Sequence, residues 1–187
     1  MVKIVSSTKR LFSLLGLMTL MISCSHKYDS DVLDLSFYQW NQWPDREAGY
    51  NQDSLKAQSE EVSALSPNPP SCGWEALHRG NGNLVRIPAA IEDFSGISWY
   101  HCRFTLPELW QEKQIVFMFE AAGPGVEVYL NESLVGTHQG NHIPFDIDVT
   151  NQIYYTLDNH LAIRISDPEG GGGIGNILVK SSELLAH

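Results

Sequence analysis

Three acidic residues in the second half of the chain have the type and spacing to be weighed as catalytic groups. Asp146 and Asp148 alternate with apolar residues in "HIPFDIDVT", so they share one face of a predicted strand, and Glu127 points outward from a neighbouring predicted strand. Enzymes that hydrolyse glycosidic bonds with retention hold two carboxyls about 5 Å apart, and same-face neighbours on a strand lie roughly 6–7 Å apart. The spacing permits this chemistry. Outward-facing acids on a sheet are ordinarily solvated, however, and we assign no catalytic residue.

Two histidines near these acids form a second set of donor atoms. His138 and His142 are separated by three residues, a spacing that brings two zinc ligands together when they lie on a helix. Gly140 and the alternating pattern around it predict a turn and strands instead. We therefore expect no metal site at this point of the chain.

The glycine-rich stretch "EGGGGIG" satisfies the pattern G-x-G-x-x-G through Gly170, Gly172 and Gly175. A dinucleotide-binding loop of this kind opens a helix and is followed by an acidic residue about 20 positions later. Here "ILV" at 177–179 continues as a strand, and only 12 residues follow Gly175. The stretch is therefore predicted to be a turn into a closing strand, and no cofactor is expected.

The N-terminus has the features of an export signal. Three basic residues precede a 12-residue apolar segment, 11–22, which is shorter than the roughly 20 residues that span a bilayer. The segment ends in "MISC", which resembles a bacterial lipoprotein signal in which Cys24 becomes the lipidated first residue. We expect residues 1–23 to be a signal peptide and the protein to be exported and held at the bacterial envelope membrane by a lipid anchor. An ordinary secretory signal is the alternative.

The overall charge argues against one class of partner. The formal net charge is −10 over 187 residues, and binding to nucleic acid requires a basic face, so a nucleic-acid partner is not expected. Beyond Cys24 the chain has two cysteines, Cys72 and Cys102. They are candidates for a disulfide in an oxidising compartment, with two buried free thiols as the favoured alternative.

From Leu84 onward the apolar residues alternate with a period of two, which predicts half-buried strands. Segments of this kind recur about every dozen residues with turn-rich sequence between them, and no long amphipathic helix intervenes. The pattern predicts an all-β, antiparallel sandwich. Upstream, we expect a polar tether over 24–35 and an aromatic-containing extension with a proline-rich break over 36–71, with the sandwich over 72–182.

The order of several motifs resembles the N-terminal sugar-binding domain of glycoside hydrolase family 2, the family of β-galactosidases and β-glucuronidases. In that family a Trp-Tyr strand ending in F-x-x-P is followed by a Val-Tyr-Leu-Asn hairpin, a Val-Gly-x-His-x-Gly segment and Pro-Phe-x-x-Asp. The matching residues here are Trp99, Tyr100, Phe104, Pro107, Val128 to Asn131, Val135, Gly136, His138, Gly140, Pro144, Phe145, Asp148 and Thr150. Glu132 and Ala89 depart from the glycines that are usual at their positions.

This resemblance implies a galactose-binding-like jelly roll and a role in carbohydrate metabolism. In the family, catalysis lies in a separate TIM barrel that supplies two glutamates, and such a barrel needs roughly 250 residues. We therefore expect a non-catalytic sugar-binding or bracing module, truncated or working with a separate catalytic chain. Its expected partners are carbohydrate or a glycosidase barrel.

Two other functions fit the same sequence: a stand-alone carbohydrate-binding surface lipoprotein, and a structural module that docks another protein. Aromatic rings pack on the faces of sugars, while acids, amides and imidazoles bind the hydroxyl groups. Our candidates for carbohydrate contact are Trp74, Trp99, His138 and His142. Packing in the core or against another domain is the alternative for each tryptophan.

Overall fold

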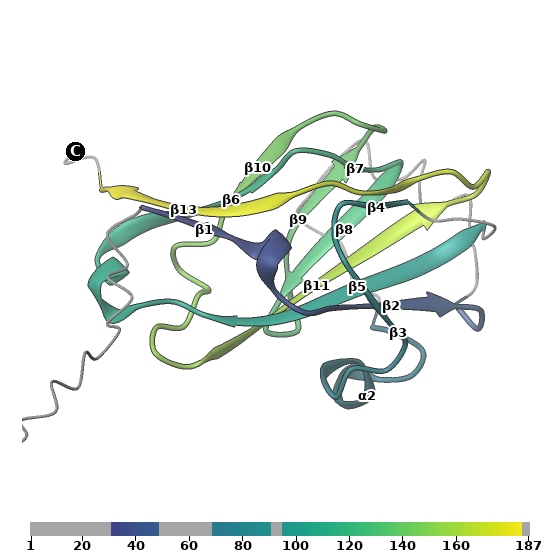
Figure 1. Ribbon diagram of the computed structural model, residues 1–187, viewed down its shortest axis with the longest axis horizontal. Coiled ribbons are helices and arrows are strands. Elements are labelled where there is room, and N and C mark those ends of the chain that lie inside the picture. The colour runs from purple at the N-terminus through teal and green to yellow at the C-terminus, as the bar shows by residue number, and fades with distance from the viewer. Residues whose placement is uncertain (1–30, 49–68, 91–94, 185–187) are drawn as a thin grey trace, which may run out of the picture.

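The computed structural model describes residues 31–48, 69–90 and 95–184, and within these ranges nearly all regular structure is β-strand. Two antiparallel sheets face each other, and a small third sheet closes one end (Figure 1). The all-β, antiparallel sandwich predicted from the sequence is therefore confirmed. No helix in the described part of the chain is long and apolar enough to cross a membrane.

The strands of the sandwich are paired with well-defined registers. The four-stranded sheet has the order β1 (Val32–Asp34), β13 (Ile177–Glu183), β6 (Lys113–Phe119) and β10 (Phe145–Asp148). The six-stranded sheet has the order β3 (Asn83–Val85), β2 (Trp40–Asp45), β5 (Gly96–Thr105), β11 (Asp158–Asp167), β8 (Gly125–Leu130) and β9 (Ser133–Gln139). The third sheet is formed by β4 (Ala89–Ala90), β12 (Gly173–Ile174) and β7 (Ala122–Gly123). The helical elements of the described residues are α2 (Trp74–His78) and two 3₁₀ turns, Leu35–Phe37 and Glu108–Trp110.

The two sheets contain strands from a part of the chain that the sequence assigned to a tether and an extension. Residues 32–34 pair with the C-terminal strand β13, and β2 pairs with β5 over six positions (Figure 1). Pro44 and three amide or acidic residues obscure the strand pattern of β2, because these types are depleted in strands. Pro44 is tolerated because β3 pairs only with residues 40–42, which leaves the proline at an edge of the sheet.

The main core lies between the two large sheets and is built from the inward-facing side chains of alternating strands. In β5, Tyr100, Cys102 and Phe104 face this core, as the period of two predicts. The neighbouring strand β11 contributes Leu161, Ile163 and Ile165, and all three are fully buried. The sequence therefore specified which face of each central strand turns inward.

The opposite face of the six-stranded sheet is also buried, because α2 and the ends of neighbouring segments cover it. Figure 1 shows α2 on the side of this sheet that faces away from the four-stranded sheet. A second core forms there around Leu77, Trp99 and Tyr129, with Trp74 of α2 packed against it. Side chains that the alternation predicts to face outward, such as Tyr129, are therefore enclosed rather than solvated.

Polar side chains hold this second layer in place. The Asp45 carboxylate is buried and accepts hydrogen bonds from the Ala48 backbone N–H (3.0 Å), from the Ser71 backbone N–H (3.0 Å) and from Trp99 Nε1 (3.1 Å). It also accepts one from the Ser71 hydroxyl. One carboxylate thus joins the end of β2, the segment that leads into α2, and β5.

A buried ion pair crosses the middle of the same face. Arg164 of β11 donates from Nη1 to Glu127 Oε1 of β8 at 2.7 Å, and the two side chains are only 13% and 7% exposed. The Tyr129 hydroxyl donates to the other carboxylate oxygen of Glu127. Glu127 is thus paired and hydrogen-bonded within the layer.

The glycine-rich stretch is a turn, as predicted. Asp167, at the end of β11, accepts hydrogen bonds from the backbone N–H of Gly170 (2.8 Å) and of Gly172 (2.6 Å). Gly170 and Gly171 have φ values of 82° and 87°, which favour glycine. The chain then enters β12 and β13, and no helix begins there.

We predict that Glu127→Gln lowers the free energy of unfolding by about 3–5 kcal/mol, because Arg164 remains buried without its counter-ion. Urea unfolding followed by tryptophan fluorescence measures this change. The exposed pair Arg103–Asp158, 3.4 Å apart, supplies the matched control, since Asp158→Asn should cost no more than about 1 kcal/mol. Equal losses for the two variants would contradict a buried structural ion pair.

We also predict that Gly172→Ala destabilises the fold by about 1–3 kcal/mol, the usual cost of forcing extra volume into a packed site. A Cβ at this position would lie 2.3 Å from the Gly123 carbonyl oxygen and 2.7 Å from Asp167 Oδ2. At Gly171 a Cβ meets nothing within 4 Å, and asparagine tolerates positive φ, so Gly171→Asn is the control. The same urea titration measures both variants. An unchanged unfolding midpoint for Gly172→Ala would show that the backbone at residue 172 does not lie this close to Gly123 and Asp167.

Candidate functional site

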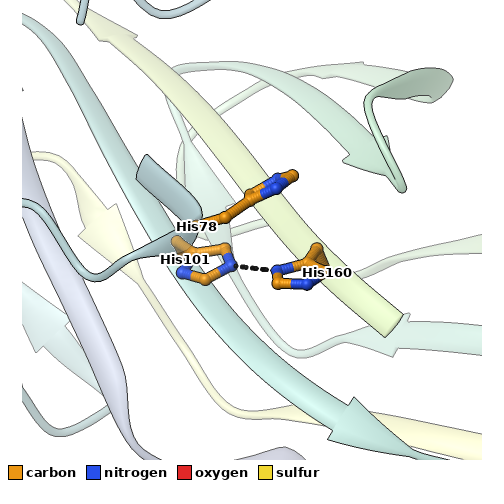
Figure 2. A group of neighbouring side chains, drawn as sticks. All are labelled: His78, His101 and His160. Atoms are coloured by element: carbon orange, nitrogen blue, oxygen red, sulfur yellow. Dashed lines mark hydrogen bonds between the residues drawn. The ribbon is translucent and has the colours of Figure 1, made fainter. Parts of the chain in front are cut away.

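Three histidines come together on the outer face of the six-stranded sheet, where α2 covers it. His78 is the last residue of α2, His101 lies in β5 and His160 lies in β11. β5 and β11 are adjacent, with His101 opposite Ala162 and His160 opposite Arg103, so the two ring positions are diagonal neighbours. Figure 2 shows the three imidazoles meeting from these three elements.

The rings are in direct contact with one another. His101 Nε2 and His160 Nδ1 are 3.0 Å apart and share a hydrogen bond (Figure 2). The His78 ring stacks on that of His160 with 4.0 Å between centroids and 25° between planes. His78 Nδ1 also lies 3.7 Å from Glu132 Oε1. The cluster therefore ties the helix to both central strands.

Burial keeps these imidazoles neutral at physiological pH. It lowers the pKa of His78 to about 4, with a further contribution from the neighbouring His160. It lowers the pKa of His101 to about 3, assisted by repulsion from the other two rings and from Arg103. The pKa of His160 is lowered by burial as well. Neutral imidazole is the form that binds metal ions.

The sequence did not indicate this cluster. Among histidine, cysteine and acidic side chains of the described ranges, these three form the group whose ligand atoms lie close enough to share one ion, all within 4.8 Å of each other. Their separations of 23 and 59 residues match no metal-binding motif. The sequence feature that could have pointed to this cluster is His101, because the alternation of β5 places it on the outer face beside Trp99 and Arg103.

Trp74 and Trp99, two of the predicted carbohydrate contacts, lie in the second core. Trp99 is fully buried, and its ring is 5.5 Å from that of Trp74 in an edge-to-face arrangement. Trp74 is half-buried and also packs against Tyr129, with 5.2 Å between centroids. In this structure the two rings face each other and their neighbours, and Trp99 has no face open to a sugar.

His138 and His142, the other two predicted contacts, lie away from the tryptophans. The His138 ring stacks on Phe145 at 4.1 Å between centroids, and Phe145 stacks on Phe119 at 4.5 Å, so this column of rings links β9 to β10 and β6. His142 is exposed, in the loop before β10, and lines a hollow beside the glycine turn. The structure therefore does not bring the four predicted residues into one site.

The cysteines and acids are also separated. Cys72 and Cys102 are free thiols, Cys72 packed against the second core and Cys102 buried in the main core, on opposite faces of the six-stranded sheet. Burial raises the pKa of both thiols, which keeps them protonated at neutral pH. Cys24, the predicted lipidation site, lies outside the described residues.

The three acids weighed as catalytic groups do not gather at one site. Glu127 is buried on the outer face of the six-stranded sheet, whereas Asp146 and Asp148 are exposed on β10 at the edge of the other sheet. Asp148 accepts hydrogen bonds from the Thr150 backbone N–H (3.0 Å) and from Gln114 Nε2 (2.8 Å). The arrangement is that of a sheet edge fixed by its own side chains.

An open pocket with an aromatic wall lies at the rim of the six-stranded sheet. It has a volume of about 490 Å³ and is lined by Trp43, Pro44, Arg46, Glu47, Asn81, Gly82 and Asn83. Trp43 is half-buried, so part of its ring faces this space. Sequence reasoning did not single out Trp43, because five tryptophans were available and their exposure depends on tertiary packing.

Comparison with known proteins agrees with this architecture. Residues 84–167 match the family described as the sugar binding domain of glycosyl hydrolases family 2. A beta-galactosidase of Thermoanaerobacter pseudethanolicus is 33% identical over 79 residues, which is 42% of this chain and 11% of that protein. A beta-glucuronidase of Formosa agariphila is 29% identical over 75 residues, 40% of this chain and 8% of that protein. The chain thus spans about a tenth of the length of these relatives.

Solved structures share the fold at low sequence identity. A putative beta-galactosidase from Bacteroides fragilis superposes with a TM-score of 0.59 at 17% identity, covering 81% of this chain and 23% of that one. A calcium binding mutant of Bacteroides uniformis beta-glucuronidase 2 gives a TM-score of 0.56 at 20% identity, covering 81% and 18%. These structures thus share the fold of this chain, and residues 84–167 match the sugar binding domain of glycosyl hydrolases family 2.

Proposed function

We propose that this chain serves a family 2 glycosidase as a non-catalytic β-sandwich module that docks against a catalytic barrel. The observation that carries the proposal is the placement of the acids. Within the described ranges Glu127 is paired with Arg164 inside a packed layer, and Asp146 and Asp148 lie on the other sheet. Glu127 is therefore not available to act with either aspartate on one glycosidic bond, and Asp148 is engaged by Gln114 and Thr150 at the edge of its sheet.

An exposed apolar surface supports docking. Phe37 and Leu84 are 88% and 68% exposed, and together with Tyr38, Val85 and Arg86 they line one shallow hollow beside the edge strand β3. Large apolar side chains gathered at one point of a surface are typical of protein–protein contacts. Because the relatives reported above are named as glycosidases, we propose a glycosidase catalytic domain as the partner. The lipoprotein-type signal ending at Cys24 would place this assembly at the bacterial envelope.

We predict that the purified protein does not hydrolyse aryl β-galactosides or β-glucuronides above a buffer blank, and that it captures a family 2 barrel polypeptide from its native cell extract. Mass spectrometry identifies the captured chain. The double variant Phe37→Ser/Leu84→Ser should lose most of the capture, while Leu157→Ser, an equally exposed apolar residue at another position, should retain it. Intrinsic turnover, or capture that is indifferent to the double variant, would overturn the proposal.

Direct carbohydrate binding is a second candidate, favoured by the rim pocket. A partly exposed indole beside amide, guanidinium and carboxylate groups is the combination that binds a sugar ring and its hydroxyls. Trp43 supplies the aromatic surface, and Asn81 and Asn83 supply amides to the same pocket. Trp99 is fully buried and Trp74 packs against it in the second core, so we propose Trp43 as the residue that contacts sugar.

We predict that glycan binding, where a glycan array detects it, is weakened about tenfold or more by Trp43→Ala, because truncating an aromatic contact residue typically costs at least about 1–2 kcal/mol. Phe37→Ala removes an exposed aromatic outside this pocket and should leave glycan affinity unchanged. A blank array for the native protein, or equal affinity for Trp43→Ala, would exclude the pocket as a sugar site and leave docking as the function.

A further inference from the structure

The cluster of His78, His101 and His160 has the composition of a metal site. Each side chain offers one ring nitrogen, and the three nitrogens lie within 4.8 Å of one another (Figure 2). Three imidazoles plus one open position is a recurrent ligand set for Zn²⁺, and imidazole also suits Co²⁺, Ni²⁺ and Cu²⁺. The ligands come from α2, β5 and β11, so two of the three are fixed by the central pair of strands.

The closest pair of nitrogens has nearly the separation that zinc requires. Zn–N bonds of about 2.0–2.1 Å in a tetrahedron place two ligand nitrogens roughly 3.3–3.4 Å apart. His101 Nε2 and His160 Nδ1 are 3.0 Å apart, and their ring planes are 13° from parallel. Binding would replace their shared hydrogen bond by two metal bonds, with a small turn of each ring. The ring that donates this hydrogen bond must move its proton to its other nitrogen, so that each neutral ring carries its one proton away from the metal and no proton is gained or lost overall.

Two nitrogens of the cluster have no hydrogen-bond partner in the structure. His78 Nε2 and His101 Nδ1 are buried and form no hydrogen bond, and such groups destabilise a fold. His101 is only 3% exposed. A metal ion bound by His78 Nε2 would give that buried nitrogen a partner.

The surroundings admit a divalent cation. Arg103, the nearest cation to His101 and His160, is paired with Asp158 at 3.4 Å, and Arg79 is paired with Glu75. Glu132 lies 3.7 Å from His78 Nδ1 and supplies a further negative charge. The imidazoles themselves are neutral at pH 7, because burial lowers the pKa of each. Each arginine near the cluster is therefore paired with an acid, and Glu132 adds one further negative charge.

The cluster can also be reached from solvent. A hollow of about 390 Å³ is lined by His78 and His101 together with Gln39, Asn41, Arg79, Gly80 and Arg103. It provides a route of entry for an ion and room for a water molecule as the fourth ligand. We propose that His78, His101 and His160 bind one divalent transition-metal ion of the Zn²⁺ class and that this ion fastens α2 to the six-stranded sheet.

The test uses tag-free protein, because an affinity tag of histidines would bind the same ions. Co²⁺ is titrated into the protein and followed by visible absorption, and Zn²⁺ is then added as competitor and followed by calorimetry. We expect one ion per chain, tetrahedral Co²⁺ absorption that Zn²⁺ abolishes, and a higher melting temperature with Zn²⁺ but not with Mg²⁺, which prefers oxygen ligands.

Variants assign the ion to the cluster. His78→Ala and His160→Asn should each weaken Zn²⁺ binding by at least about tenfold, since even loss of a partner of a metal ligand costs about 10–100-fold. His142→Ala, an exposed histidine outside the cluster, and Cys72→Ser should leave the affinity unchanged. Circular dichroism checks that each variant is folded. If His160→Asn does not fold, the Zn²⁺ affinity of His78→Ala, a change at the end of a short surface helix, decides the question. Failure of the native protein to bind Zn²⁺ or Co²⁺, or equal affinity in His78→Ala, would overturn the proposal. Neither result bears on glycosidase docking.

Discussion

The pairing of β5 with β11, buried on both faces, is the constraint on which the rest of the structure depends. The two strands are in register over ten residue pairs, from Asp158 opposite Thr105 to Asp167 opposite Gly96. Their inward side chains form the main core, and their outward side chains form the second core beneath α2. An antiparallel sheet commonly has one solvated face. Here the chain covers that face itself, so the polar groups on it must find partners within the protein.

That requirement explains the polar features of the covered face. Glu127 pairs with Arg164 and Asp45 accepts the Trp99 indole N–H, because these groups are buried, and the three histidines contact one another at the end of α2. A buried charge without a partner is costly, which accounts for the close pairing. The two hollows that we propose for contact with other molecules lie instead at the rim of the sheet. The pocket at Trp43 and the apolar hollow at Phe37 and Leu84 both lie there, beside β2 and β3.

The sequence predicts the central strands and the class of fold because a period of two in apolar residues reports directly which side chains face a core. It is less informative where that period fails. β1 has three residues and β2 contains Pro44, so neither resembles a strand until its partner is known. It also cannot distinguish an open face from a covered one. The alternation places Trp99 on the outer face of β5 but does not show that α2 covers this face. The histidine cluster depends on the same helix, since His78 joins His101 and His160 only when α2 folds onto the sheet.

The outer face of the six-stranded sheet is a packed structural layer around Trp99 and Tyr129 and not an exposed binding platform. Hydrogen exchange of the tryptophan indole N–H groups, followed by NMR, tests it most directly. The Trp99 indole is fully buried and bonded to Asp45 at 3.1 Å, so its proton should exchange only when the protein unfolds globally, like that of Trp40, which is bonded to the Leu35 carbonyl at 2.8 Å. The partly exposed Trp43 should exchange much faster. If Trp99 exchanges as fast as Trp43, the face is open and this account of the protein is wrong.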